Sequence, residues 1–328
     1  MKRWFAAAMF AFGVAMTGMS SASAADGPAF ELVALGVGGG VGTDDLSAYL
    51  LRAHGDTHFL ALDAGTLVTG IDKARAQGSL AGSTGGILHD SISAYFISHG
   101  HLDHVAGLLI ASPEDHGNKP IYGLASTLDV LSRDYFNWET WPNLADRGKP
   151  PALGWYHLVD EAPGQWFPVQ GTLMTAQVWP LSHDSVVSSM LLLRAGDVYY
   201  AYFGDTGPDA LSKGKHDLAD AWSTLAPLVR RHALKGIQIE TSFPNDVADA
   251  KLFGHLTPAW LQRELQVLAN ASGGRDALRG LPVVVDHIKP SLEPGRDTRA
   301  LVGAQLATGN TLGVHFILPS QGERIALP

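Results

Sequence analysis

Three histidines and an aspartate lie within six consecutive residues of this chain, in the segment His99-Gly100-His101-Leu102-Asp103-His104. Neutral imidazole and carboxylate groups are ligands that suit zinc, manganese and iron. Because alternate residues of a short loop can point to different sides, one such loop can serve two ions. The segment therefore predicts a site for divalent metal, with Zn²⁺ as the leading candidate and Mn²⁺ or Fe²⁺ as alternatives.

A metal ion needs three or four protein ligands, so further ligands must come from other parts of the chain. Three candidates each follow a strand-like apolar segment: His183, Asp205 and His287. Ligand-binding groups in α/β sheets lie at such strand ends. Any one of them alone would be interpreted as a structural or turn residue. Together with residues 99–104 they predict a two-metal site.

The elements that position this segment can be located from hydrophobic patterns. The segment follows the apolar run Ile92–Ser98 and precedes Val105–Ile110, so it lies where a strand ends and a helix begins. Two strand-like segments around Ala195-Gly196-Asp197 predict a hairpin, and therefore antiparallel pieces. Helical patterns (219–232, 258–268) lie among strand-like segments at 30–37, 58–63, 172–179, 187–194, 198–203, 236–239, 282–286 and 314–318. The order predicts an α/β fold in which two mixed sheets pack face to face between helices, in four αββα layers.

Residues 112–164 differ in composition from the rest of the chain, because they are rich in Pro, Gly, Trp and Tyr. We interpret this stretch as an insertion in the catalytic domain. It either roofs the site or forms an ordinary buried aromatic cluster, and the sequence favours neither.

The composition limits the partners. The chain has no cysteine, which excludes disulfides and thiolate ligands, and its formal charge is −9 without a Lys/Arg-rich run. Polymeric nucleic acid is therefore not expected as a partner, because its binding needs many phosphate contacts. A small anion stays compatible, since bound metal ions can dominate the local field. A homodimer is also compatible with the sequence.

The N-terminus predicts a cleaved signal peptide over residues 1–24. Lys2 and Arg3 precede the uncharged apolar run 4–16, and Ala22-Ser23-Ala24 supplies a cleavage site. Cleavage would leave residues 25–328 as one catalytic domain and take the formal charge from −9 to −11. We expect the mature chain to be periplasmic or secreted and not to enter the membrane.

The His-x-His-x-Asp-His motif resembles the signature of the metallo-β-lactamase superfamily. More narrowly, the chain resembles the class II 3′,5′-cyclic-nucleotide phosphodiesterases from about residue 30 to its end. The pieces that carry this resemblance are 97–107, Tyr135-Phe-Asn-Trp-Glu-Thr-Trp-Pro-Asn143, Glu240-Thr-Ser-Phe-Pro-Asn245, Gly254-His-Leu-Thr-Pro258 and His287-Ile-Lys-Pro290. The first piece is shared across the superfamily, whereas the others are narrower.

The resemblance implies a ligand set and a reaction. One ion takes His99, His101 and His183, the other takes Asp103, His104 and His287, and Asp205 bridges them. Two ions ~3.5–4 Å apart can share a hydroxide that attacks phosphorus. The implied reaction is hydrolysis of cyclic AMP or cyclic GMP to the 5′-monophosphate.

The resemblance also implies the catalytic residues Asp103, His255 and Glu240. His255 is the candidate proton donor to the leaving ribose oxygen, and Glu240 orients it, similar to the Glu-Thr and His-x-Thr elements of tRNA 3′-processing phosphodiesterases. Alternatively, His255 is a structural residue ahead of Thr257, a plausible N-cap before Pro258.

Candidate substrate contacts are weaker. Asn137 and Trp141 could contact a purine, but core packing explains them equally well, and Thr257 is a further candidate. The run Gly36–Gly42 resembles a phosphate-cradling loop but lacks the Lys-Ser/Thr end of a P-loop. We interpret this run as a turn near the edge of the active site.

Three other functions stay open on the residues alone. Another two-metal hydrolase, such as a lactonase, β-lactamase or thioester hydrolase, is the main alternative. A second alternative is an iron oxidoreductase on the same scaffold, but one of the flavin-diiron type would be expected to have Glu in the first motif, where this chain has His101. A nucleotide-binding protein without catalysis would not need a bridging carboxylate.

Overall fold

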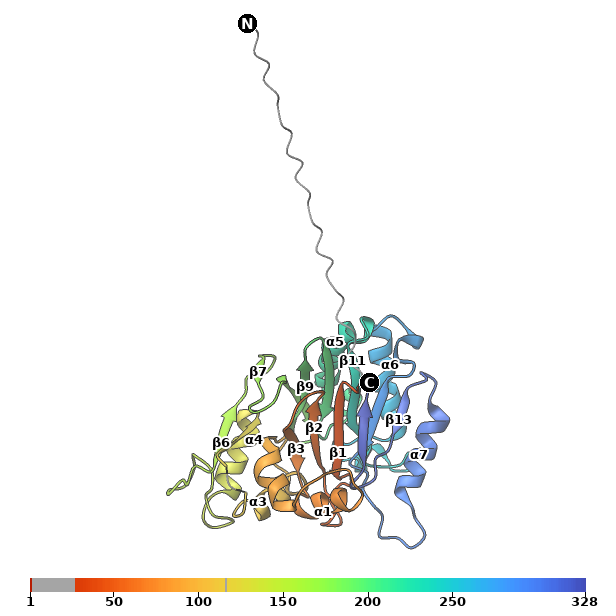
Figure 1. Cartoon of the computed structure of the whole chain (residues 1–328). Coiled ribbons are helices and arrows are strands. Elements are labelled where there is room, and N and C mark those ends of the chain that lie inside the picture. Colours follow the sequence, from red (N-terminus) through yellow and green to blue (C-terminus); the bar gives the residue numbers. More distant parts are fainter. Residues whose placement is uncertain (2–26, 116) are drawn as a thin grey trace.

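The computed structural model describes residues 27–115 and 117–328, besides Met1, so the predicted signal peptide falls outside these ranges. Two seven-stranded sheets form the centre of the molecule (Figure 1). The first sheet has the order β14-β1-β2-β3-β4-β5-β6. Its strands in chain order are Phe30–Gly36, Ala48–Ala53, Phe59–Ala64, Ile92–Phe96, Lys119–Gly123, Tyr156–Asp160 and, for β14, Arg324–Leu327.

The second sheet has the order β13-β12-β11-β10-β9-β8-β7. Its strands β7 to β13 are Phe167–Pro168, Thr175–His183, Val186–Ala195, Val198–Phe203, Leu234–Glu240, Pro282–Asp286 and His315–Ile317. The hairpin predicted around Gly196 is confirmed, because β9 and β10 pair in antiparallel register with Ala195 opposite Val198.

Seven α-helices are assigned in the described residues: α1 (Val68–Ala76), α2 (Thr84–Gly86), α3 (Leu102–Ala111), α4 (Ala125–Val130), α5 (Asp217–Arg230), α6 (Pro258–Ala271) and α7 (Thr298–Gly309). Short helical turns cover 87–91, 131–135, 209–211, 249–251 and 275–278.

Three apolar clusters show how the layers are assembled. The central cluster contains side chains from both sheets, such as Leu32 and Tyr202. A second cluster joins the outer face of the first sheet to α1 and α3, and a third joins the second sheet to α5, α6 and α7. Period-2 alternation divides β1 between two of them, since Leu32 faces the other sheet and Val33 faces the helices. The predicted αββα arrangement is therefore confirmed.

The strand directions bring the candidate ligands to one edge. Strands β3 to β6 run parallel, and so do β10 to β13. β8 runs antiparallel to β9, which is antiparallel to β10, so β8 ends at the same edge as β10. The carboxyl ends of these strands carry the residues predicted as ligands, as expected for an α/β sheet.

Part of the stretch 112–164 belongs to the first sheet, because it supplies β5, α4 and β6. Within it, Phe136 and Tyr156 are fully buried, and Tyr135, Trp141 and Trp155 pack against the cluster under α1 and α3. Much of its aromatic content therefore forms a buried cluster, and whether the stretch also roofs the site stays a prediction.

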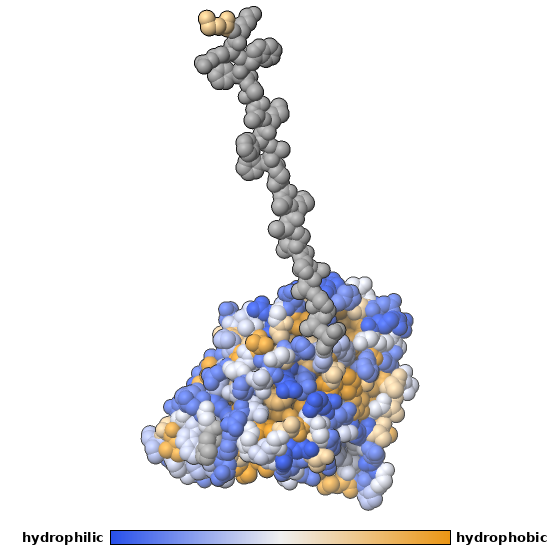
Figure 2. Space-filling model, in the orientation of Figure 1, coloured by the Kyte–Doolittle hydropathy of each residue, from blue (hydrophilic) through white to orange (hydrophobic). Residues whose placement is uncertain are grey.

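No helix in the described part of the chain is long and apolar enough to cross a membrane. On the face shown in Figure 2, hydrophilic residues are spread over the surface and separate smaller hydrophobic areas.

Candidate metal centre and active site

Asp205 lies at the centre of a ring of imidazoles at the edge where the strands end. Its Oδ2 atom is 3.3 Å from His287 Nε2, 3.4 Å from His104 Nε2, and 3.8 Å from both His99 Nε2 and His183 Nε2. His183 and His287 are distant in sequence from the segment 99–104 that supplies the other two, so the complete arrangement exists only in the folded protein. Its position suits the bridging role implied for Asp205.

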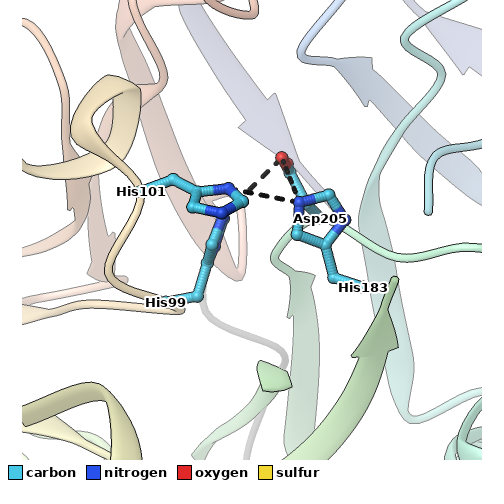
Figure 3. Close-up of side chains that lie close together, drawn as sticks. All are labelled: His99, His101, His183 and Asp205. Carbon is cyan, nitrogen blue, oxygen red and sulfur yellow. Dashed lines mark hydrogen bonds and ion pairs between the residues drawn. The ribbon is translucent and has the colours of Figure 1, made fainter. Parts of the chain in front are cut away.

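The first set of possible ligands is His99, His101, His183 and Asp205, whose ligand atoms all lie within 4.8 Å of one another. Figure 3 shows the His101 and His183 rings facing each other beside Asp205. His101 Nδ1 and His183 Nε2 are 3.3 Å apart. Side chains from the loop after β4, the end of β8 and the end of β10 therefore converge.

The second set is Asp103, His104 and His287, again within 4.8 Å. His287 Nε2 lies 3.2 Å from Asp103 Oδ2. Asp205, His255 and His287 form a third group by the same criterion. Of the seven predicted ligands, only His101 and Asp103 are not buried, so the centre opens to solvent on their side.

The donor atoms fit two cations. His99 Nε2 and His104 Nε2 are buried and have no hydrogen-bond partner, which is costly unless something else contacts them. The other ring nitrogen of each is held in place: His99 Nδ1 by Ser98 Oγ at 3.1 Å, and His104 Nδ1 by Asp63 Oδ2 at 2.7 Å. Such outer partners fix the tautomer and direct the second nitrogen to a metal.

The remaining buried ligands follow the same rule. His183 Nδ1 lies 2.9 Å from the Gly254 carbonyl, and His287 Nδ1 lies 2.8 Å from Ser242 Oγ. Each Nε2 is thereby left to face Asp205. His287 also adopts a positive φ of 52° directly after β12, a strained backbone of the kind that concentrates at functional sites.

The electrostatics favour cations at this edge. Burial lowers the pKa of His183 to about 4 and holds the pKa of His99 well below its ordinary value, so both rings are neutral. Burial opposes ionisation of Asp205, but His287 and His104 outweigh it and keep its pKa low. Burial also opposes a charge on His104, yet Asp205 and Asp63 raise its pKa well above normal. The carboxylates that favour a proton there equally favour a metal ion.

A histidine–carboxylate pair stands beside this centre. His255 Nδ1 lies 2.8 Å from Glu240 Oε1 and 3.7 Å from Asp205 Oδ2. Burial lowers the pKa of His255, but Glu240 more than compensates, so its pKa is raised; Lys289 acts in the opposite direction. Glu240 is itself fixed by the backbone N–H groups of Thr206 and Ser242. The structure therefore brings together His255, the candidate proton donor, and Glu240, the residue expected to orient it.

Comparison with known proteins decides the family. A family model described as cAMP phosphodiesterases class-II matches residues 76–322. This chain belongs to that family.

Two curated relatives match this chain over most of its length. A probable 3′,5′-cyclic-nucleotide phosphodiesterase of Yersinia pestis is 48% identical over 305 residues, covering 90% of this chain and 88% of the relative. A 3′,5′-cyclic-nucleotide phosphodiesterase of Aliivibrio fischeri is 45% identical over 308 residues, covering 90% of this chain and 92% of the relative.

Solved structures agree on the fold. Unliganded yeast PDE1 has a TM-score of 0.79 at 23% identity, covering 92% of this chain and 99% of that chain. The metallo-β-lactamase fold protein YhfI of Bacillus subtilis has a TM-score of 0.58 at 14% identity, with 91% and 99% covered. The metallo-β-lactamase fold of this class II phosphodiesterase family member is thus confirmed.

The three residues predicted to contact substrate, Asn137, Trp141 and Thr257, each form hydrogen bonds within the protein. Asn137 Oδ1 accepts hydrogen bonds from the N–H groups of Glu139 and Thr140, and Trp141 Nε1 donates to Ser112 Oγ. Thr257 is the N-cap of α6 and accepts from Trp260 N. All three side chains therefore have partners within the protein, and their contact with substrate stays a prediction.

Two buried residues of the centre were not found from the sequence. Asp63 accepts hydrogen bonds from Ser98 and His104, and Ser242 joins Glu240 to His287. Asp63 follows the apolar segment of β3, which is the same signal that marked Asp205. Ser242 lies in the piece Glu240–Asn245 that carries the family resemblance, but its role was not assigned, because that role depends on which loops the two sheets bring together.

Proposed function

We propose that this chain hydrolyses 3′,5′-cyclic AMP and cyclic GMP to the 5′-monophosphates at a two-metal centre. The observation that carries the proposal is the buried Glu240–His255 pair beside two groups of metal ligands. Membership of the class-II cAMP phosphodiesterase family supports the same substrate class and disfavours a lactonase, β-lactamase or thioester hydrolase.

The residues that would hold the ions are His99, His101 and His183 for one, Asp103, His104 and His287 for the other, and Asp205 for both. Bound divalent cations supply activation of water and stabilisation of the negative charge on the phosphoryl oxygens. Zn²⁺ is our leading candidate, since imidazole and carboxylate suit it, and Mn²⁺ or Fe²⁺ are alternatives.

The reaction consumes one water and breaks the bond between phosphorus and the ribose 3′ oxygen. The leaving oxygen needs a proton, and we propose that His255 gives it from Nε2. Glu240 holds Nδ1 and raises the pKa of His255 against the effect of burial, which favours the protonated ring needed for this step. General acid catalysis of this kind contributes about 10²- to 10⁴-fold.

The test uses the chain without its first 24 residues. The purified protein is assayed for bound metals, and cyclic AMP is followed by chromatography. We expect 5′-AMP as the product, an inert His101→Ala variant, and a His255→Ala variant that keeps its metals and loses about 10²- to 10⁴-fold in kcat. Bound metals with no 5′-AMP would contradict the proposal, and metal loss in His255→Ala would instead make His255 a ligand or fold residue.

We also propose export through the predicted signal at residues 1–24, with removal of external cyclic nucleotide as the purpose. Fractionation and N-terminal sequencing test this: a mature chain that begins at Ala25 outside the cytoplasm supports it. A full-length chain in the cytoplasm would contradict it.

A further inference from the structure

Lys289 lies two residues after the predicted metal ligand His287. Its backbone N–H donates to the carbonyl of Ser242 at 3.0 Å, so its position is tied to the loop that also orients His287. The side chain is half-buried, unlike the exposed Pro290 that follows. This backbone tie therefore holds Lys289 at the site.

The glycine-rich run Gly36–Gly42 accommodates this side chain. A Cβ atom on Gly39 would lie 2.8 Å from Lys289 Cγ and 2.6 Å from His287 Cε1, so only glycine leaves room there for both. The next residue, Gly40, donates its N–H to Asp103 Oδ2 at 2.9 Å. Gly39 and Gly40 thus lie between the lysine and two predicted metal ligands, where the centre meets solvent.

The charge of Lys289 is not balanced by a partner. Among the residues that the structure describes, none forms an ion pair or hydrogen bond with its ammonium group, whereas the buried Lys119 pairs with Asp115 at 2.5 Å. A lysine that packs on Gly39 beside the predicted ligand His287, without a carboxylate of its own, is suited to an anionic ligand.

We propose that Lys289 is a substrate-binding residue whose ammonium contacts a nonbridging oxygen of the cyclic phosphate, on the side of the site formed by Gly39 and Gly40. The inference rests on the proposed function for the identity of the substrate. The contact itself requires only a phosphoryl group held at the metal centre. Charge develops on the same oxygens as water adds to phosphorus, so the contact lowers KM and raises kcat together.

The experiment compares four forms of the metal-loaded chain: wild type, Lys289→Met, Lys289→Arg and Lys73→Met. Methionine keeps the stem that packs on Gly39 and removes only the charge, whereas arginine keeps the charge. Lys73 is an exposed lysine of α1 and serves as the charge-matched control. Metal content, calorimetric binding of inorganic phosphate, and KM and kcat for cyclic AMP are measured for each form.

We expect Lys289→Met to keep both metals, to bind phosphate roughly 10- to 100-fold more weakly, and to lose a similar factor in kcat/KM, as for one charged hydrogen bond. Lys289→Arg should keep most of the phosphate affinity and most of kcat/KM, and Lys73→Met should match the wild type in both. Unchanged phosphate binding in Lys289→Met, no phosphate binding by the wild type, or loss of metal in Lys289→Met would each overturn the proposal.

The two proposals can fail separately. If the wild type binds phosphate through Lys289 but does not hydrolyse cyclic AMP, the proposed function fails and the phosphate contact stands. If it hydrolyses cyclic AMP and Lys289→Met does so equally well, the proposed function stands and the role of Lys289 fails.

Discussion

Asp63 and Asp115 are two buried carboxylates on the first-sheet side of the molecule, and both accept a hydrogen bond from a tyrosine. Asp63, at the end of β3, accepts from Tyr202 of the opposite sheet at 2.6 Å. Asp115, just after α3, accepts from Tyr95 at 2.6 Å and from Tyr156 at 3.0 Å. Their surroundings differ in one respect, the source of positive charge.

Asp115 has its own cation, because Lys119 Nζ lies 2.5 Å from its Oδ1 and donates a further bond to the Leu88 carbonyl. Asp63 has no lysine or arginine partner among the described residues, and its remaining bonds come from Ser98 and His104. A buried carboxylate is costly unless its charge is balanced. For Asp63 the balance must come through His104, which directs its other nitrogen to the metal centre. Asp115 therefore stabilises the fold, whereas Asp63 belongs to the site.

Metal removal should have the largest effect, and this effect should arise at the metal centre beside Asp63 and not at the Asp115–Lys119 pair. Chelation is expected to abolish phosphodiesterase activity and to lower the free energy of unfolding, by about 2.7 kcal/mol for each ion held at 100 times its dissociation constant. Added Zn²⁺ should restore both quantities. Thermal unfolding and turnover before and after dialysis measure this, and equal unfolding temperatures for the loaded and stripped chain would show that the centre holds no metal.

Asp115→Ala should destabilise the fold strongly without touching the metal centre. It leaves the buried Lys119 ammonium without its partner, which costs about 3–5 kcal/mol. Urea unfolding measures the loss, and kcat per folded molecule and metal content should equal the wild type.

The double variant Asp115→Ala/Lys119→Met is the control, because it removes both charges and should recover part of the stability. A reduced metal content in Asp115→Ala would remove the distinction drawn between the two aspartates.

Asp63→Asn tests the site aspartate with a change of one atom. The amide presents an N–H group to neighbours that are themselves donors, so His104 loses its orientation. Loss of such an outer partner typically costs about 10- to 100-fold in metal affinity or activity. Competition with a zinc chelator measures the affinity. Asp115→Asn is the matched control and should bind zinc as the wild type does; equal affinities for both variants would refute a special role for Asp63.

The site residues that could be predicted from the sequence are those marked by a local pattern. Residues 99–104 are close in sequence, and His183, Asp205 and His287 were found because each follows an apolar strand. The structure makes His183 the last residue of β8 rather than a loop residue, because β8 continues through Pro180. A proline is tolerated there because β7 pairs with β8 only at residues 175 and 176, so Pro180 has no strand partner on that edge.

Other elements were missed for local reasons. Strand β2 has the sequence Ala-Tyr-Leu-Leu-Arg-Ala, whose Ala, Leu and Arg favour helix, and its pairing with β1 and β3 overrides that preference. Strand β5 contains a proline and a glycine, so it was included in the presumed insertion. Ser242 and Lys289 lie in short motifs that carry the family resemblance, but their individual roles depend on contacts between loops that the two sheets bring together.

Ser242→Ala should give the smallest effect, because it removes one neutral hydroxyl from this network. That hydroxyl donates to Glu240 Oε2 at 2.6 Å and accepts from His287 Nδ1 at 2.8 Å, so its loss frees one metal ligand to rotate. We expect zinc affinity to fall about tenfold, the lower end for an outer partner. Ser272→Ala is the control, since Ser272 is also buried but its hydroxyl has no hydrogen-bond partner. If both variants bind zinc as the wild type does, His287 is held by its strained backbone rather than by Ser242.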